Sequence, residues 1–175
     1  PGFKHAKIKS VATQLGIRET RRIIGDYIMT VDDLRKNKKF NDCIGFSMYG
    51  WDLPDPDKPS IQPFADDKKS GFKPKIEKGL TTPLPYRIMV PKGLDNLICP
   101  GRAVSVEGQV LGPVRVMAPC MAMGEAAGIA ACQVVSSNIS FSNVNIQQLR
   151  SELVRWGAII EEEMLPPVYP RIDQI

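Results

Sequence analysis

The spacing of apolar and polar residues predicts extended segments in the first part of the chain. Residues 7–17 alternate apolar and polar side chains, which is typical of a strand with one buried face. Residues 97–99 are wholly apolar, which is typical of a strand buried deep in a sheet. Aromatic and apolar content predicts further strands or extended segments at residues 23–29, 43–53 and 85–90.

The same spacing predicts three helices. A short one begins after Thr30, because its hydroxyl can cap the helix and Asp33 stands three positions later; this helix should end near residues 38–39. A second helix, rich in small residues, covers residues 119–135, with Pro119 in its first turn. The third covers residues 145–156, with an apolar stripe that includes Trp156 and with Gly157 suited to its C-cap.

Composition excludes several classes of function. The net charge is only +4, and the lysine-rich stretches lack interleaved aromatic residues, so we expect no nucleic-acid partner. Four widely spaced cysteines and a single histidine, His5, provide no metal-ligand spacing, so we expect no metal. We interpret His5 as incidental, and Cys99, Cys120 and Cys132 as buried free thiols.

Residues 114–135 form an apolar run that could suggest a membrane helix, and Gly124-x-x-x-Gly128 adds a pattern used in membrane helix pairs. Arg115, Pro119 and Glu125 interrupt the run, and each charge at mid-bilayer costs about 3 kcal/mol. We therefore predict no membrane span. The small residues on this helix are better explained by close packing than by cofactor contact; they are Gly124, Ala127, Gly128 and Ala131.

No two of the 14 glycines stand two positions apart, so the chain contains no G-x-G-x-x-G phosphate loop. Nevertheless residues 15–27, 84–102 and 115–128, in this order, resemble the FAD-dependent oxidoreductases related to the flavoprotein subunits of fumarate reductase and L-aspartate oxidase. Some members of that family carry the label xanthan lyase, which flavin chemistry does not support. The likeness runs from about residue 7 to about residue 158.

The resemblance implies an α/β fold: the C-terminal portion of a Rossmann-like FAD-binding domain with part of a β-rich, substrate-facing segment. Residues 1–22 would form a strand and turn at the domain edge. Residues 23–91 would face the substrate, with a proline-rich loop at 54–78 that is either a connector or a lid. Residues 92–160 would complete the FAD-binding portion, and residues 161–175 would form an irregular tail.

The resemblance also implies which residues contact the cofactor. The strand ending at Gly101 would pass under the ribityl chain, and the helix start would point at the flavin C2 carbonyl. Many relatives have an acidic residue where this chain has Arg102, so backbone groups or Glu107 would hold the ribityl hydroxyls instead. The cofactor-binding residues expected on this basis are Gly101, Arg102, Glu107, Cys120, Met121 and Ala122.

Arg115 is the main candidate for a substrate clamp, because it aligns with an arginine that binds a substrate carboxylate in the related enzymes. Its alternative is a structural arginine paired with an acid. Tyr86 and Arg87 are further catalytic candidates, with a half-buried tyrosine and a surface arginine as the alternative. Three further arginines could bind a substrate anion or the FAD pyrophosphate, but we favour a solvated turn in which they pair with Glu19 and Asp26; these are Arg18, Arg21 and Arg22.

The resulting hypothesis is a fragment of an FAD-dependent oxidoreductase that transfers a hydride between a small organic substrate and flavin. Its partner would be the missing N-terminal FAD-binding half, on the same protein or another subunit, and the chain alone would be inactive. The alternative is a non-catalytic subunit or interaction module of flavoprotein ancestry, which would bind through its apolar helix and proline-rich loop.

Overall fold

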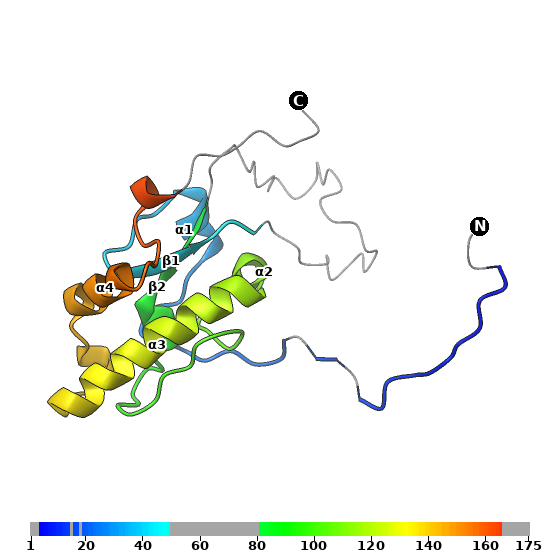
Figure 1. Ribbon diagram of the computed structural model, residues 1–175, viewed down its shortest axis with the longest axis horizontal. Coiled ribbons are helices and arrows are strands. Elements are labelled where there is room, and N and C mark those ends of the chain that lie inside the picture. Colours follow the sequence, from blue (N-terminus) through cyan, green and yellow to red (C-terminus); the bar gives the residue numbers. More distant parts are fainter. Residues whose placement is uncertain (1–3, 15, 18, 50–80, 166–175) are drawn as a thin grey trace.

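A computed structural model describes residues 4–14, 16–17, 19–49 and 81–165. In this part of the chain, helices surround a sheet of two strands (Figure 1). The long helix α3 packs against β1 and α4, and the N-terminal segment leads away from this body. The elements in order are α1 (Val31–Arg35), β1 (Cys43–Ser47), β2 (Thr82–Pro85), η1 (Tyr86–Met89), η2 (Gly108–Val110), α2 (Leu111–Val114), α3 (Met117–Ser137), η3 (Phe141–Asn143), α4 (Ile146–Arg155) and η4 (Glu162–Met164).

The sheet is antiparallel, with Phe46 opposite Pro83 and Cys43 opposite Pro85. Prolines fit here because a two-stranded sheet has only edge strands, which need not donate every N–H. Two isolated bridges lie outside these strands, one between Gly25 and Pro91 and one between Met29 and Val106. The core formed around the layer includes fully buried side chains from most elements, among them Met29, Ile44, Leu84, Met89, Leu111, Met123 and Leu149.

The predicted helix ends are confirmed where they depend on local capping. The Asp33 carboxylate accepts the Thr30 N–H at 2.9 Å, and the Thr30 hydroxyl accepts the Asp33 N–H at 3.2 Å, which is a capping box. Asn145 caps α4 through a 3.1 Å bond from the Gln148 N–H, and Gly157 follows α4 with a φ of +92°. The predicted extended segment at residues 23–29 is also confirmed by its two bridges.

Three strand predictions are wrong in whole or in part. Among the described residues of 7–17 there is no strand, and the Ile8 and Val11 side chains are 86% and 79% exposed. Residues 97–99 also form no strand, and Leu97 is exposed. Both segments have apolar side chains, but among the residues that the structure describes no neighbouring strand completes a ladder with them. Residues 86–89 of the predicted strand 85–90 form the single 3₁₀ turn η1, because β2 ends at Pro85.

Other expectations need smaller corrections. Strand β1 ends at Ser47, and residues 50–53 of the predicted strand lie outside the described residues, as do the loop 54–78 and most of the tail. Trp156 is 70% exposed and so does not belong to the buried stripe of α4. The described cysteines are free, but only Cys43 is buried; Cys99 and Cys120 are partly exposed and Cys132 is exposed.

Helix α3 is the one described helix with the length and apolar composition to cross a membrane. It begins at Met117, so the Arg115 charge that counted against a span in the sequence lies before it, and Glu125 remains inside. Its inner face is that of a core helix, since Met123, Ala126 and Ala130 are fully buried. The length and composition of α3 are therefore weak evidence for a membrane span. That the chain has no membrane span stays a prediction.

The mixture of helices with a small sheet is compatible with the predicted α/β fragment. The Rossmann-like assignment and the division into segments stay predictions.

Candidate functional site

The site is built on the junction between α2 and α3. Val116 is extended, with ψ of 163°, and separates the last residue of α2 from the first turn of α3. Within the described residues no side chain caps α3, and its first turn carries no acidic residue. The Cys120 N–H bonds to the Val116 carbonyl at 3.2 Å, and Pro119 has no N–H. The N–H groups of Met117 and Ala118 therefore point out of the helix end and can bind an acceptor.

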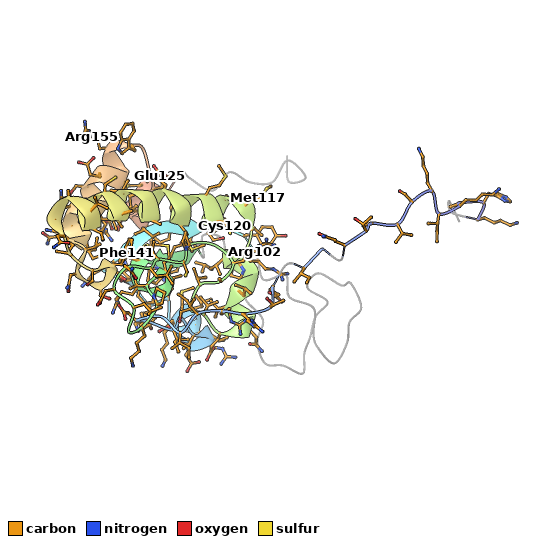
Figure 2. All side chains as sticks on the ribbon, turned by 90° about the horizontal axis from the view of Figure 1, so that it is seen from below. Arg102, Met117, Cys120, Glu125, Phe141 and Arg155 are labelled. Carbon is orange, nitrogen blue, oxygen red and sulfur yellow. The ribbon has the colours of Figure 1, made fainter. Side chains whose placement is uncertain are left out.

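A glycine turn lies against this helix start. Gly101 has a φ of +93°, and a Cβ added to it would stand 3.9 Å from the Cys120 Sγ. A left-handed residue without a side chain keeps the backbone close to the helix while leaving space beside it. Figure 2 shows Arg102, Cys120 and Met117 at the same end of α3.

The charges at the start of α3 are positive. Arg102 is exposed and forms no ion pair with the described part of the chain, and its charge acts on the Cys120 thiol. Burial raises the pKa of that thiol, and the Arg102 charge opposes the rise. The thiol lies 3.5 Å from the Arg115 carbonyl oxygen and donates to it. The helix end adds about half a positive charge, so the region favours an anionic or carbonyl-bearing ligand.

The backbone groups of α3 that can reach a ligand differ between the sequence prediction and the structure. The sequence places the flavin contacts at Met121 and Ala122, but α3 begins at Met117, so these residues lie beyond its first turn. Their N–H groups are used by the helix itself, which bonds each N–H to the carbonyl four residues back. The free donors belong instead to Met117 and Ala118. Of the expected cofactor residues, the structure brings together Gly101, Arg102 and Cys120.

Glu107 has a structural use that the sequence did not reveal. Its carboxylate accepts the Val31 N–H at 2.8 Å, at the N-terminus of α1. A negative charge in that position stabilises the helix end. The two residues are 76 positions apart, so no local pattern could indicate the contact. Its proposed role at the ribityl chain stays a prediction.

Arg115 is paired with an acid, which was the structural alternative for it. Its side chain is 5% exposed, and its guanidinium lies 2.9 Å from the Glu19 carboxylate. The sequence placed Glu19 and Asp26 in pairs within their own turn, but in the described residues, which do not include Arg18, both have partners elsewhere in the fold. Glu19 binds Arg115, and Asp26 accepts a 2.9 Å hydrogen bond from the Ser142 hydroxyl. The pairing is specified by packing across the fold, not by sequence neighbours.

The side chains of Tyr86 and Arg87 lie in different surroundings. The Tyr86 side chain is 2% exposed, its hydroxyl donates to the Phe141 carbonyl at 3.0 Å, and burial raises its pKa. Arg87 forms a two-point ion pair with Asp42, with contacts of 2.9 and 3.1 Å, which raises the pKa of Arg87. These contacts stabilise the body of the protein, and a catalytic role for either residue stays a prediction.

A second polar cluster was not anticipated. The Tyr27 hydroxyl donates to Asp33 at 2.7 Å, and the Lys38 ammonium donates to the same hydroxyl at 2.6 Å. The Arg87 guanidinium lies over the Tyr27 ring, 5.2 Å from its centre. Burial alone would raise the pKa of Asp33, but hydrogen bonds from Thr30, Tyr27 and Lys38 outweigh it and lower the pKa. The cluster fastens α1 to η1.

Comparison with known families decides the class of protein. The family model described as FAD dependent oxidoreductase matches residues 1–153. The chain belongs to this family. No curated protein and no solved structure matches it. The FAD-dependent oxidoreductase predicted from the three motifs is therefore confirmed, and its cofactor is FAD. The closer relation to fumarate reductase and L-aspartate oxidase stays a prediction.

The residues at the start of α3 fit part of this cofactor. The uncapped N–H groups of Met117 and Ala118 match a carbonyl acceptor, Gly101 leaves space beside them, and Arg102 supplies positive charge. A flavin ring presents carbonyl oxygens along one edge, so this donor set suits the ring. The sequence lacks the glycine-rich loop that commonly binds the diphosphate of FAD.

Proposed function

We propose that the chain is the flavin-contacting, C-terminal part of a Rossmann-like FAD-binding domain in an enzyme that transfers a hydride between a small organic substrate and flavin. The observation that carries this proposal is the uncapped start of α3 beside the turn at Gly101. Bound FAD would supply the hydride-accepting ring, whose pyrimidine edge becomes more negative on reduction.

The chain's own residues would act on that edge. The N–H groups of Met117 and Ala118 donate hydrogen bonds to the carbonyl, and the helix end favours negative charge there. Arg102 adds a full positive charge on the same side. The Met117 and Met121 side chains are 83% and 74% exposed on this face, where they would cover the ring and exclude water. Arg115, which follows α2 and is separated from α3 by Val116, would hold an anionic group of the substrate beside the ring.

The diphosphate must be held by another unit, because the chain has no G-x-G-x-x-G sequence. The outer face of α3 supports an association with such a unit. Val135 is 82% exposed, and a Cβ placed on Gly124 or Gly128 would meet no atom within 4 Å in the described residues, apart from the backbone of α3 itself and the adjacent residues. The expectation of close packing is therefore wrong for Gly124 and Gly128, whereas Ala127 is buried and Ala131 packs against the core as expected. The open face also supports the second candidate, a non-catalytic module that binds a partner through α3.

Two measurements test the proposal. The purified chain should contain no FAD, and visible absorbance showing stoichiometric flavin would contradict the dependence on a second unit. When the assembled FAD-loaded protein is prepared, Arg115→Ala should reduce turnover at least a hundredfold while flavin content stays constant. Equal losses of turnover and flavin would make Arg115 a structural residue. A stable monomer that never associates with a phosphate-binding unit would contradict the first candidate and favour the second.

A further inference from the structure

Strand β1 contacts both sides of the bend between α2 and α3. A Cβ added to Gly45 would stand 3.6 Å from the Ala122 Cβ, so the strand lies directly against α3 at this point. Two positions later, the Ser47 hydroxyl donates to the Pro113 carbonyl of α2 at 2.6 Å (Figure 1). Residues two apart in a strand share a face. One face of β1 therefore holds the two helices that meet at Val116.

The direction of the hydrogen bonds at Ser47 follows from its two partners. A carbonyl can only accept and a backbone N–H can only donate, so the hydroxyl gives its hydrogen to Pro113 and accepts from the Tyr49 N–H at 3.2 Å. Ser47 is 3% exposed, and it pairs with Thr82 across the sheet. The hydroxyl is therefore fixed at the end of the strand by hydrogen bonds on both sides.

The Pro113 carbonyl lies where a helix lacks donors of its own. The last four carbonyls of a helix have no partner within it, and α2 is only four residues long. Pro113 is buried, and a buried carbonyl without a donor is unfavourable. The Ser47 hydroxyl supplies this donor from a position 66 residues away in the sequence. On the other side of the bend, the Cys120 thiol donates to the Arg115 carbonyl at 3.5 Å.

We propose that Ser47 is a positioning residue for the flavin: by holding the end of α2, its hydroxyl sets the direction in which α3 starts. Two residues separate α2 from α3, so a displacement at Pro113 is passed on to the first turn of α3. Without the hydroxyl, the Pro113 carbonyl turns towards another donor, and the N–H groups of Met117 and Ala118 turn with it. The inference rests on the proposed function for the place of the flavin at this helix start.

The effect on α3 can be measured on the chain itself, without flavin. Ser47→Ala removes the hydroxyl. Ser105→Ala is the matched control, because Ser105 is also buried and its hydroxyl has no hydrogen-bond partner among the described residues. We expect Ser47→Ala to shift the amide NMR signals of Met117 and Ala118, and Ser105→Ala to leave them in place. Ser47→Thr keeps the hydroxyl and should restore the original signals. If Ser47→Ala does not fold, Ser47→Cys, with its weaker donor, should shift the same signals.

The consequence for the flavin is measured in the FAD-loaded protein assembled with its phosphate-binding unit. N–H groups that are turned away from the flavin carbonyl stabilise the reduced ring less. Ser47→Ala should therefore lower the equilibrium constant for flavin reduction about threefold or more relative to Ser105→Ala, which is roughly 15 mV for a two-electron couple. A purely structural role of Ser47 would lower the unfolding temperature and leave this potential unchanged.

Two results would overturn the proposal. One is a Ser47→Ala variant whose amide signals at residues 117–118 stay in place. The other is equal potentials for the two serine variants when those of Met117→Pro and Met117→Ala differ. Failure of the proposed function would appear instead as equal potentials for Met117→Pro and Met117→Ala, with the NMR shifts of Ser47→Ala still present.

Discussion

Gly101 lies against Cys120 at the start of α3: a Cβ added to Gly101 would stand 3.9 Å from the Cys120 Sγ. The contact connects the turn after Pro100 with the uncapped end of the long helix. The contact places the backbone of Gly101, which has no side chain, beside the free N–H groups at the start of α3. The family to which the protein belongs binds FAD. The arrangement explains why glycine is needed at this position.

Replacing Gly101 by alanine should destabilise the chain by about 1–2 kcal/mol, because a φ of +93° is strained for a residue with a Cβ. Urea unfolding measures the change. The matched control is Gly124→Ala, whose added Cβ meets no atom within 4 Å in the middle of a helix. That variant should be more stable by up to about 1 kcal/mol, since alanine is the better helix former. Equal effects of the two variants would contradict this account of the turn.

The Tyr86 hydroxyl provides a test that separates a structural from a catalytic role. Tyr86→Phe removes its hydrogen bond to the Phe141 carbonyl and should lower the free energy of unfolding by about 1 kcal/mol. Turnover of the FAD-loaded protein should stay within about twofold, because the hydroxyl is buried in the body. Turnover that fell a hundredfold with unchanged stability would instead support the catalytic assignment.

Acidification should weaken the cluster around Asp33. The folded-state pKa of this carboxyl lies below its ordinary value of 3.8, so ionised Asp33 contributes stability above that value. The contribution is lost as the pH falls through the lower folded-state pKa. We expect Asp33→Asn to reduce stability at pH 7 and to flatten the loss of stability below about pH 4. Asp32→Asn removes the same charge at an exposed neighbouring carboxylate and is the matched control; identical urea-unfolding profiles for both variants would contradict the prediction.

The parts of the fold that the sequence predicted correctly depend on neighbours along the chain. Thr30 with Asp33, and Asn145 with Gly157, set helix ends through contacts within a few residues. The order of three motifs was likewise sufficient to predict the FAD-dependent family. Residues 97–99 show the limit, because an apolar run indicates burial but a strand exists only where a second strand pairs with it.

The contacts of the candidate site could not be predicted from the sequence for the same reason. Glu19 forms an ion pair with Arg115, and Glu107 accepts a hydrogen bond from Val31. Because the partners are far apart in the sequence, no periodic pattern of residues indicates these contacts. The sequence predicted the free N–H donors of α3 near Met121, and the structure has them at Met117. The start of the helix was missed because its N-cap is Val116, which is not a polar residue. Sequence rules that search for Ser, Thr, Asp or Asn at a helix start cannot locate such an end.

The central claim is that the first N–H groups of α3 bind the flavin, and Met117→Pro tests it most directly. Proline is well tolerated as the first residue of a helix, and Val116 before it is already extended, so the substitution removes one N–H with little change in the backbone. Met117→Ala keeps the N–H and is the control. One hydrogen bond to a developing charge contributes about 1.5–3 kcal/mol, which corresponds to roughly 30–60 mV for a two-electron couple.

The measurement is the flavin reduction potential of the FAD-loaded protein assembled with its phosphate-binding unit. Both variants lack the methionine side chain and only Met117→Ala keeps the N–H, so the account predicts that the potential of Met117→Pro lies roughly 30–60 mV below that of Met117→Ala. Equal potentials for both variants, with FAD fully bound, would contradict the placement of the flavin at the start of α3.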